Sequence, residues 1–134
     1  MIDAENEIFT LVASALREQF PGITVYNETV LSPSSFPCVC IEETDNYAYV
    51  NTISSSSNEN HAVVVYEVNI YSNKGSGKKA ECKSIFAAVD DAMQKIGFVR
   101  TASNPILLEG EATILRMFGR YTAVLSGNKT IYRR

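Results

Sequence analysis

The residues best placed to do chemistry in this chain lie in a glycine-rich segment, NKGSGKKA, at positions 73–80. An alternating apolar run leads into it and a helical pattern leaves it, as in a phosphate-binding loop. Such a loop reads G-x-x-x-x-G-K-[ST], because backbone amides cradle the phosphates while the hydroxyl holds magnesium. Taking Gly77 and Lys78 as the G-K pair puts Ser72 where the first glycine belongs and Lys79 where the hydroxyl belongs. We therefore interpret the segment as a turn between a strand and a helix, with no nucleotide or other cofactor.

Three cysteines and a single histidine are the other candidates for metal or nucleophilic chemistry. Cys38 and Cys40 stand two residues apart in an alternating run, so they project from one face of a strand. Tetrahedral zinc takes about four ligands, and only Cys82, His61 and scattered carboxylates remain, so buried apolar thiols are the expected outcome. His61 directly follows a polar segment, which is a poor place for the base that activates a nucleophile. We expect no catalytic residue, no metal site and no enzyme activity.

Basic and aromatic residues alternate in the final third of the chain. Basic residues interleaved with aromatic ones can bind single-stranded nucleic acid, but the net charge of −3 contrasts with the basic character of most nucleic-acid-binding modules. Arginine is also the favoured cation at protein interfaces, where its planar fork pairs with carboxylates. A protein interface is our leading interpretation, with a solvated strand face and nucleic-acid binding as alternatives. The residues assigned to it are Arg116, Arg120, Arg133 and Arg134.

Length and composition indicate one domain spanning residues 1–134. A chain of 134 residues, 46% of them hydrophobic, can bury a single sizeable core. No apolar stretch approaches the roughly 20 residues that a membrane-spanning helix needs. The acidic N-terminus does not resemble a signal peptide, and three cysteines without an export signal favour a reducing cytosol. We expect no membrane partner.

Charge divides unevenly along the chain. Residues 1–67 carry one basic and ten acidic residues, whereas residues 68–134 carry eleven basic and five acidic residues. Such polarity suits a charged partner or a second copy of the same chain. Alternatively, the two halves interleave in space and their charges mix.

Two segments have the three- and four-residue apolar spacing of amphipathic helices. The first is predicted from Asp3 to Phe20, with Asp3 as its N-cap and a stop at Pro21. The second is predicted from Lys78 to Ile96, followed by a glycine where helices commonly end.

Alternating patterns predict five strands. Cys38 to Val50 and His61 to Ser72 form a long β-hairpin around the serine-rich segment NTISSSSNEN, and these strands are longer than a compact core requires. Short strands are predicted at 23–27 and 98–102, the latter ending in a turn at 103–105, and a long last strand runs from Glu111 to Leu125. The order α-β-β-β-α-β-β predicts an α+β fold with a mixed or mainly antiparallel sheet and both helices packed on one face. The first hairpin strand is expected to place these residues on one face: Val39, Ile41, Glu43, Asp45, Tyr47 and Tyr49.

The segment YEVNIYSNKGSGKKAECKSIFAAVDDAMQKIGFVRT, followed by RMFGRYTAVLSGNKTIYRR, resembles the tail-terminator and tail-completion proteins of long-tailed bacteriophages and prophages of Gram-positive hosts. The resemblance covers about residues 62–134, with FPCVCIEE as an upstream echo. It implies an α/β fold with two helices on a sheet. It also implies assembly into a ring, typically a hexamer, that caps the tail tube, takes part in head-tail joining and has no enzyme activity.

From the resemblance and the charge pattern we expect a structural virion protein that assembles in the bacterial host cytoplasm. A ring of identical subunits requires two different, complementary patches on each chain. The expected partners are other copies of the chain, the tail tube protein and the head-tail connector, with DNA only passing through the lumen. Alternatives are a head-completion or connector adaptor protein, or a small nucleotide- or nucleic-acid-binding protein. Besides the arginines, the residues expected to contact a neighbour or the tube are Tyr47, Tyr49, Ser54, Ser55, Ser56, Ser57 and Asn58.

Overall fold

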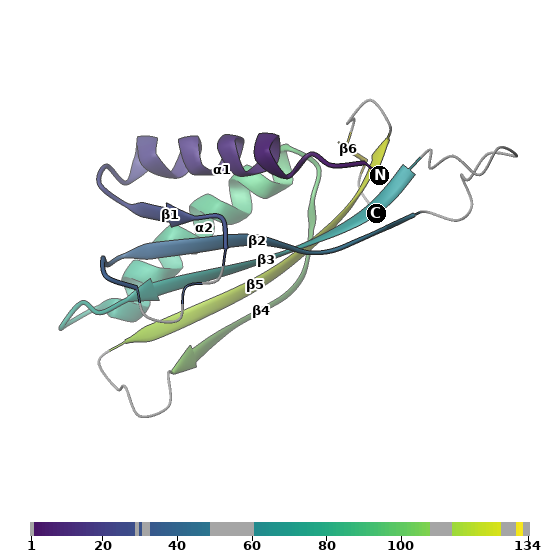
Figure 1. Ribbon diagram of the computed structural model, residues 1–134. Helices are drawn as coiled ribbons and strands as arrows, with labels where there is room; N and C mark the ends of the chain where they lie inside the picture. The colour runs from purple at the N-terminus through teal and green to yellow at the C-terminus, as the bar shows by residue number, and fades with distance from the viewer. Residues whose placement is uncertain are drawn as a thin grey trace, which may run out of the picture.

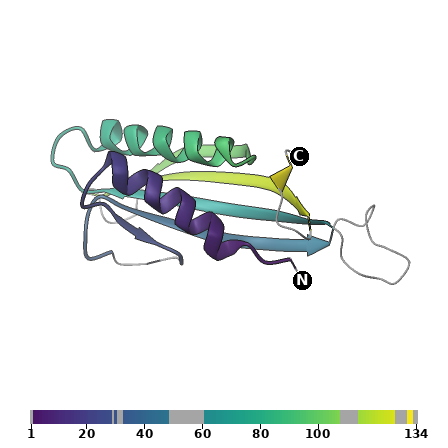
Figure 2. The same ribbon diagram turned by 90° about the horizontal axis from the view of Figure 1, so that it is seen from above.

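Two helices cover one face of a single β-sheet (Figures 1 and 2). The computed structural model describes residues 2–28, 30, 33–48, 61–107, 114–126 and 131–132. The predicted order α-β-β-β-α-β-β and the α+β class are confirmed, with one two-residue strand added at the end. The elements are α1 (Glu5–Gln19), β1 (Thr24–Tyr26), β2 (Cys38–Ala48), β3 (His61–Ser72), α2 (Lys78–Lys95), β4 (Val99–Leu107), β5 (Leu115–Ser126) and β6 (Ile131–Tyr132).

The sheet is mixed and has the strand order β1-β2-β3-β5-β4. β1 pairs with β2 in parallel along only three residues, and every other pairing is antiparallel. The predicted hairpin of β2 and β3 is present, and β3 has its predicted bounds. β6 pairs with β5 at Val124 and Leu125, just past the point where β4 stops pairing with it at Thr122. The two hairpin strands, β2 and β3, continue past the N-terminal end of α1, as expected from their length (Figures 1 and 2).

The core lies between the helices and the sheet, because each helix presents an apolar stripe to an alternating strand face. α1 buries Ile8, Val12 and Leu16 there, and α2 buries Ile85, Val89 and Met93 among others. We call the strand surface beneath the helices the helix face. Its main buried members are Val39, Ile41, Val64, Tyr66, Val68, Ile70, Leu115, Met117, Tyr121, Ala123 and Leu125.

The other side of the sheet, which we call the open face, carries no helix. A small second cluster covers one end of it, where Cys38, Cys40 and Tyr71 are buried against the partly buried Tyr26, Val30, Phe36 and Ile114. Further along, the open face is built from β2, β3 and β5. Its members there are Glu42, Asp45, Tyr47, Val65, Glu67, Asn69, Arg116, Phe118, Arg120 and Thr122.

The prediction that one face of β2 runs from Val39 to Tyr49 is wrong beyond Glu43. Glu43 pairs with Tyr66, but Asp45 pairs with Val65, so the register shifts by one residue between Glu43 and Asp45. An extra residue in one strand reverses the orientation of all the residues after it. Asp45 and Tyr47 therefore lie on the open face, and Asn46 takes their place on the helix face.

The turn predicted at residues 103–105 is also wrong, because β4 continues through it to Leu107. Ser103 pairs with Gly119 and Pro105 with Met117. Proline lacks a backbone donor and is tolerated in strands at a sheet edge. β4 is the last strand in the sheet order, so Pro105 can occupy it without breaking a central ladder.

Helix α1 begins at Glu5 with Ala4 at the cap position, so Asp3 is not the N-cap residue. Asp3 still serves the start of the helix, since its Oδ1 accepts a hydrogen bond from the Glu5 backbone N–H at 3.1 Å. A carboxylate at this end is favourable, because the helix dipole is positive there. Helix α2 ends at Lys95. Gly97 lies two residues later with φ = 107°, in the left-handed region that glycine adopts readily.

Candidate interaction surfaces

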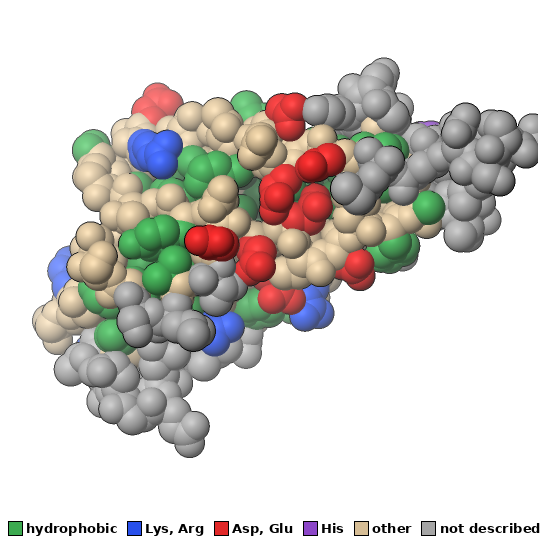
Figure 3. Space-filling model, in the orientation of Figure 1, with side chains coloured by type: hydrophobic (Ala, Val, Ile, Leu, Met, Phe, Trp, Pro, Cys, Tyr) green, Lys and Arg blue, Asp and Glu red, His purple; other side chains and the backbone are tan. Residues whose placement is uncertain are grey.

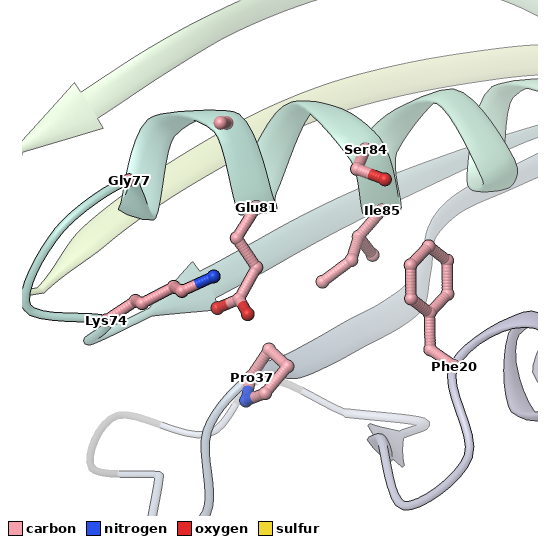
Figure 4. Close-up of a pocket in the computed structure, with 8 residues that line it drawn as sticks. Phe20, Pro37, Lys74, Gly77, Glu81, Ser84 and Ile85 are labelled. Atoms are coloured by element: carbon pink, nitrogen blue, oxygen red, sulfur yellow. The ribbon is translucent and has the colours of Figure 1, made fainter.

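The glycine-rich turn frames a pocket at the start of α2 (Figure 4). The pocket has a volume of about 380 Å³ and is lined by Phe20, Pro37, Lys74, Gly77, Ala80, Glu81, Ser84 and Ile85. Glu81 projects into it, and its Oε1 accepts a 2.6 Å hydrogen bond from the Ser72 hydroxyl. Ser72 itself is fully buried at the end of the central strand β3.

This arrangement suits a structural turn better than a phosphate site. A phosphate at the helix start would approach the negatively charged Glu81. A P-loop also follows a parallel strand, whereas β3 is antiparallel to both of its neighbours. The turn is shaped by Gly77, which has φ = 84° at the N-cap position of α2. These features favour the interpretation made from the sequence.

The three cysteines lie on two different sides of the sheet. Cys38 and Cys40 share the open face, as predicted, while Cys82 lies in α2 against the helix face. All three are buried free thiols. Burial raises the pKa of Cys38 to about 12 and that of Cys82 to about 11, so neither is a thiolate near neutral pH. Within the described ranges, no group of three His, Cys, Asp or Glu side chains is arranged to hold a metal ion.

The open face brings together two of the four predicted interface arginines. Arg116 Nε donates to Asn69 Oδ1 at 2.7 Å, and Arg120 forms an ion pair of 3.0 Å with Glu67. Glu67 belongs to the acidic half of the sequence and Arg120 to the basic half, so here the two halves do interleave. Glu67 also lies directly opposite Glu42 across the β2–β3 pairing, which places two like charges beside one cation.

The exposed aromatic of this face is Tyr47, whose exposed fraction is 44%. Near it, a shallow depression of about 350 Å³ is lined by Thr44, Asp45, Val65, Glu67, Arg120 and Thr122. The open face therefore offers charge, a hollow and an exposed ring close together. Arg133, Arg134, Tyr49 and the segment Ser54, Ser55, Ser56, Ser57 and Asn58 lie outside the described residues.

A cluster of acidic residues on the opposite side of β2 was not singled out from the sequence. We call Asp3, Glu5 and Glu43 the acidic cluster; it joins the start of α1 to the middle of β2. The Glu43 backbone N–H donates to Glu5 Oε2 at 3.4 Å. Figure 3 shows acidic side chains gathered over this part of the molecule. The sequence pattern does not reveal the cluster, because Glu5 and Glu43 are 38 residues apart and meet only through tertiary packing.

Three buried polar atoms lie at the acidic cluster and make no close, well-oriented hydrogen bond to a residue that the structure describes, although Tyr66 and Asn46 are near enough to Glu43 to act on its pKa. They are Glu43 Oε1, Asn46 Oδ1 and the hydroxyl of the fully buried Tyr66. Burial raises the pKa of the Glu43 carboxyl, and the charges of Glu5 and Asp3 raise it further, while hydrogen bonding by the Tyr66 hydroxyl and the Asn46 amide opposes that rise. Burial, together with the charge of Glu43, likewise raises the pKa of Tyr66. The site is rich in acceptors and negative charge.

A second charged surface lies at the start of α2. We call Lys74, Lys78, Lys79 and Lys83 the lysine end; all but Lys78 are exposed. None of these lysines forms an ion pair with another residue that the structure describes. The helices run in opposite directions, so the lysine end and the acidic cluster lie at opposite ends of the helix layer (Figures 1 and 2).

Comparison with known proteins gives a match of fold. No family model and no curated protein matches the chain. Among solved structures, a chain from the virion of a native gene transfer agent (GTA) particle is similar, with 16% sequence identity and a TM-score of 0.58. The match covers 88% of this chain and 93% of that chain. The two share one fold. None of the helices described here is long and apolar enough to cross a membrane.

Proposed function

We propose that this chain is a structural protein of a phage or prophage virion, assembled in the cytoplasm of a bacterial host. The observation that carries the proposal is the fold it shares, over nearly the whole length of both chains, with a component of a gene transfer agent virion. The resemblance of residues 62–134 to tail terminators supports the finer role. In that role the chain forms a ring, typically a hexamer, that caps the tail tube and joins it to the head connector.

The surfaces of the chain support docking better than catalysis. Glu81 projects into the pocket beside the glycine-rich turn. The raised pKa values of Cys38 and Cys82 keep these thiols protonated and therefore unreactive. The open face, which no helix covers, instead carries Arg116, Arg120 and the exposed Tyr47. Because the Arg120–Glu67 pair is partly exposed, an acidic group of a partner can compete for the arginine at little cost.

Electron microscopy of particles tests the proposal. Lysates from the genome that encodes this chain, with its gene deleted, should contain heads and tails that are not joined, and wild-type protein supplied from a plasmid should restore joining. Normal joined particles after deletion would contradict the virion-assembly role.

The open face is tested separately with charge reversals. Arg116→Glu combined with Arg120→Glu should fail to restore joining. The matched control is Arg17→Glu with Lys95→Glu, which makes the same change in charge on exposed helix positions. If the Arg116/Arg120 variant restores joining as well as the control does, the arginines are not part of the contact.

A head-completion or connector adaptor would also belong to the virion. Co-purification separates the two roles. A tail terminator should be recovered with the tail tube protein from particles that lack heads. Recovery with the portal or connector alone would assign the adaptor role instead.

A further inference from the structure

The charges of the open face are sorted by strand. Among the residues that the structure describes, β2 and β3 contribute Glu42, Asp45 and Glu67 to this face and no lysine or arginine. β5 contributes Arg116 and Arg120 and no acidic residue. β3 and β5 are neighbours at the centre of the four long strands of the sheet. One half of the face is therefore acidic and the other half basic, which is the charge pattern of a surface that can complement a copy of itself.

The central ion pair of this face leaves hydrogen-bonding capacity on both of its members. Nε and Nη2 of Arg120 donate to the same carboxylate oxygen, Glu67 Oε2, at 3.3 and 3.0 Å. Nη1 of the arginine and Oε1 of the glutamate form no hydrogen bond with any residue that the structure describes. An arginine and a carboxylate can form two parallel hydrogen bonds through separate atoms. Each copy therefore retains one charged donor and one charged acceptor at a partly exposed position.

A second copy can satisfy these groups if two open faces pack against each other. A two-fold axis parallel to the strands, between β3 and β5, places β3 of each copy over β5 of the other. Because Glu67 and Arg120 are directly paired across β3 and β5, each glutamate then faces the arginine of the other copy. Packed sheets lie about 10 Å apart, a gap that a glutamate and an arginine can span together. A two-fold axis perpendicular to the strands would lay β3 over β3 and bring like charges together, so the charge pattern selects the first arrangement.

The neighbours of the ion pair suit the same packing. Phe118 lies beside Arg120, whose guanidinium carbon is 5.8 Å from the centre of the ring. Val65 lies on the other side of the pair and helps to line the shallow hollow of the open face. Both apolar side chains are only partly buried. A second sheet would remove more of their surface from water, which is favourable by about 25 cal/mol per Å².

The edges of the sheet are less suited to a second copy than its face. β4, the last strand in the sheet order, carries Pro105, which has no backbone donor. Its register with β5 also shifts between Arg100 and Ala102. At the other edge, β1 has only three residues. Proline, irregular register and short edge strands are devices that prevent edge-to-edge pairing.

We propose that two copies of this chain associate through their open faces, with Glu67 of each copy paired to Arg120 of the other. The contact goes beyond the ring proposed above, because it uses one surface twice and closes at two copies, whereas a ring requires a head-to-tail contact. It belongs to the free chain. A virion partner that binds the open face must therefore displace the second copy.

Sedimentation velocity of the purified chain tests the contact. The wild type should sediment as a dimer at low salt, and added salt should weaken the dimer because it screens the charges. Glu67→Arg and Arg120→Glu should each dimerise at least roughly tenfold more weakly, because like charges then meet across the axis. The matched controls, Glu18→Arg and Arg17→Glu, make the same changes at exposed positions of α1, on the helix-covered side of the sheet, and should dimerise as the wild type does (Figure 1). A wild type that stays monomeric at millimolar concentration would overturn the proposal, as would variants that dimerise as well as their controls.

A mixture of the two variants distinguishes this contact from other roles for the same charges. The arginine introduced in one variant faces the glutamate introduced in the other, and the unchanged Arg120 and Glu67 also face each other. The mixture should therefore regain dimers, as should a single chain that carries both substitutions. If neither does while circular dichroism shows folded chains, the open faces do not meet in this way. That result would leave the virion role standing, since gene deletion tests it, and restored dimers would stand even if deletion had no effect on particles.

Discussion

Replacing Gly119 with alanine should destabilise the chain, because the ring of Phe86 already occupies the space that the new methyl group needs. An ideal Cβ at Gly119 would lie 2.6 Å from Phe86 Cε2 and 2.8 Å from Phe86 Cζ. Carbon atoms in contact are normally about 3.5–4.0 Å apart, so the ring must shift by about 1 Å. Phe86 belongs to the core cluster beneath α2, where there is little room for such a shift.

The expected magnitude follows from the cost of overpacking, which is typically about 1–3 kcal/mol. Unfolding entropy near 60 °C is about 2.1 cal/mol/K per residue, or about 0.28 kcal/mol/K for this chain. Each kcal/mol therefore lowers Tm by about 3.6 °C, and the substitution should lower it by roughly 4–11 °C. Thermal unfolding followed by circular dichroism measures the change.

Gly75→Ala is the matched control. An added Cβ at Gly75 meets nothing within 4 Å, and the same glycine-to-alanine change acts on the unfolded chain. The double variant Gly119→Ala with Phe86→Leu should lose less stability than the sum of the two single losses, because leucine leaves room for the methyl group. If the free energies of unfolding of Gly119→Ala and Gly75→Ala differ by less than about 0.5 kcal/mol, Phe86 of α2 does not pack tightly against Gly119 of β5.

Three further predictions concern the charged and titratable groups. The pKa of Glu43 is raised above its ordinary value of 4.5 in the folded chain. Ionisation of this carboxyl therefore lowers the free energy of unfolding; the loss is complete above the raised pKa and absent well below pH 4.5. Urea unfolding should therefore show Glu43→Gln gaining stability relative to wild type between pH 4 and pH 8; a constant difference would contradict the burial of the carboxylate. Arg120→Ala should change the free energy of unfolding by less than about 1 kcal/mol, because its pair with Glu67 is partly exposed; a larger loss would show that the pair supports the fold. Ellman's reagent at pH 8 should label Cys38 and Cys82 only after denaturant is added, because burial keeps both thiols protonated; fast labelling of the native chain would refute that.

The secondary structure was accessible from the sequence wherever one strong period runs through a segment. β3 carries Val64, Tyr66, Val68 and Ile70 at alternate positions and is bounded by polar residues, so both of its ends could be predicted. The second helix was placed within one residue at its end, because its apolar stripe and Gly97 agree. Local patterns carry this information because they reflect which face of each element is buried.

Features that depend on neighbouring strands were not accessible. The shift after Glu43 is set by the pairing of β2 with β3, so the sequence alone placed Asp45 and Tyr47 on the wrong face. Pro105 is acceptable in β4 only because that strand lies at the sheet edge, which the sequence does not reveal. Arg116 and Arg120 were predicted to lie at an interface, but their partners Asn69 and Glu67 within the sheet were not predicted.

The acidic cluster illustrates the same limit for a site. Asp3 was predicted to be the N-cap of the first helix, whereas Ala4 holds that position and Glu5 lies in the first turn. The meeting of Glu5 with Glu43 depends on how α1 packs over the sheet, and the buried position of the Tyr66 hydroxyl depends on the core beneath. A charge pattern predicts that surfaces exist, whereas only the packing shows which charges share one.

The division of the sheet into a helix-covered side and a bare side bears on how such chains diverge. Substitutions beneath the helices must preserve volume, as the tight approach of Phe86 to Gly119 shows. On the bare side, charge and shape can change without disturbing the interior. One architecture can thus carry different surface residues, in keeping with a TM-score of 0.58 at only 16% identity. The extra residue in β2 also constrains the length of this strand. Deleting one residue there would exchange the two sides of the strand's last third. Chains with this fold should therefore vary in the composition of this strand far more than in its number of residues.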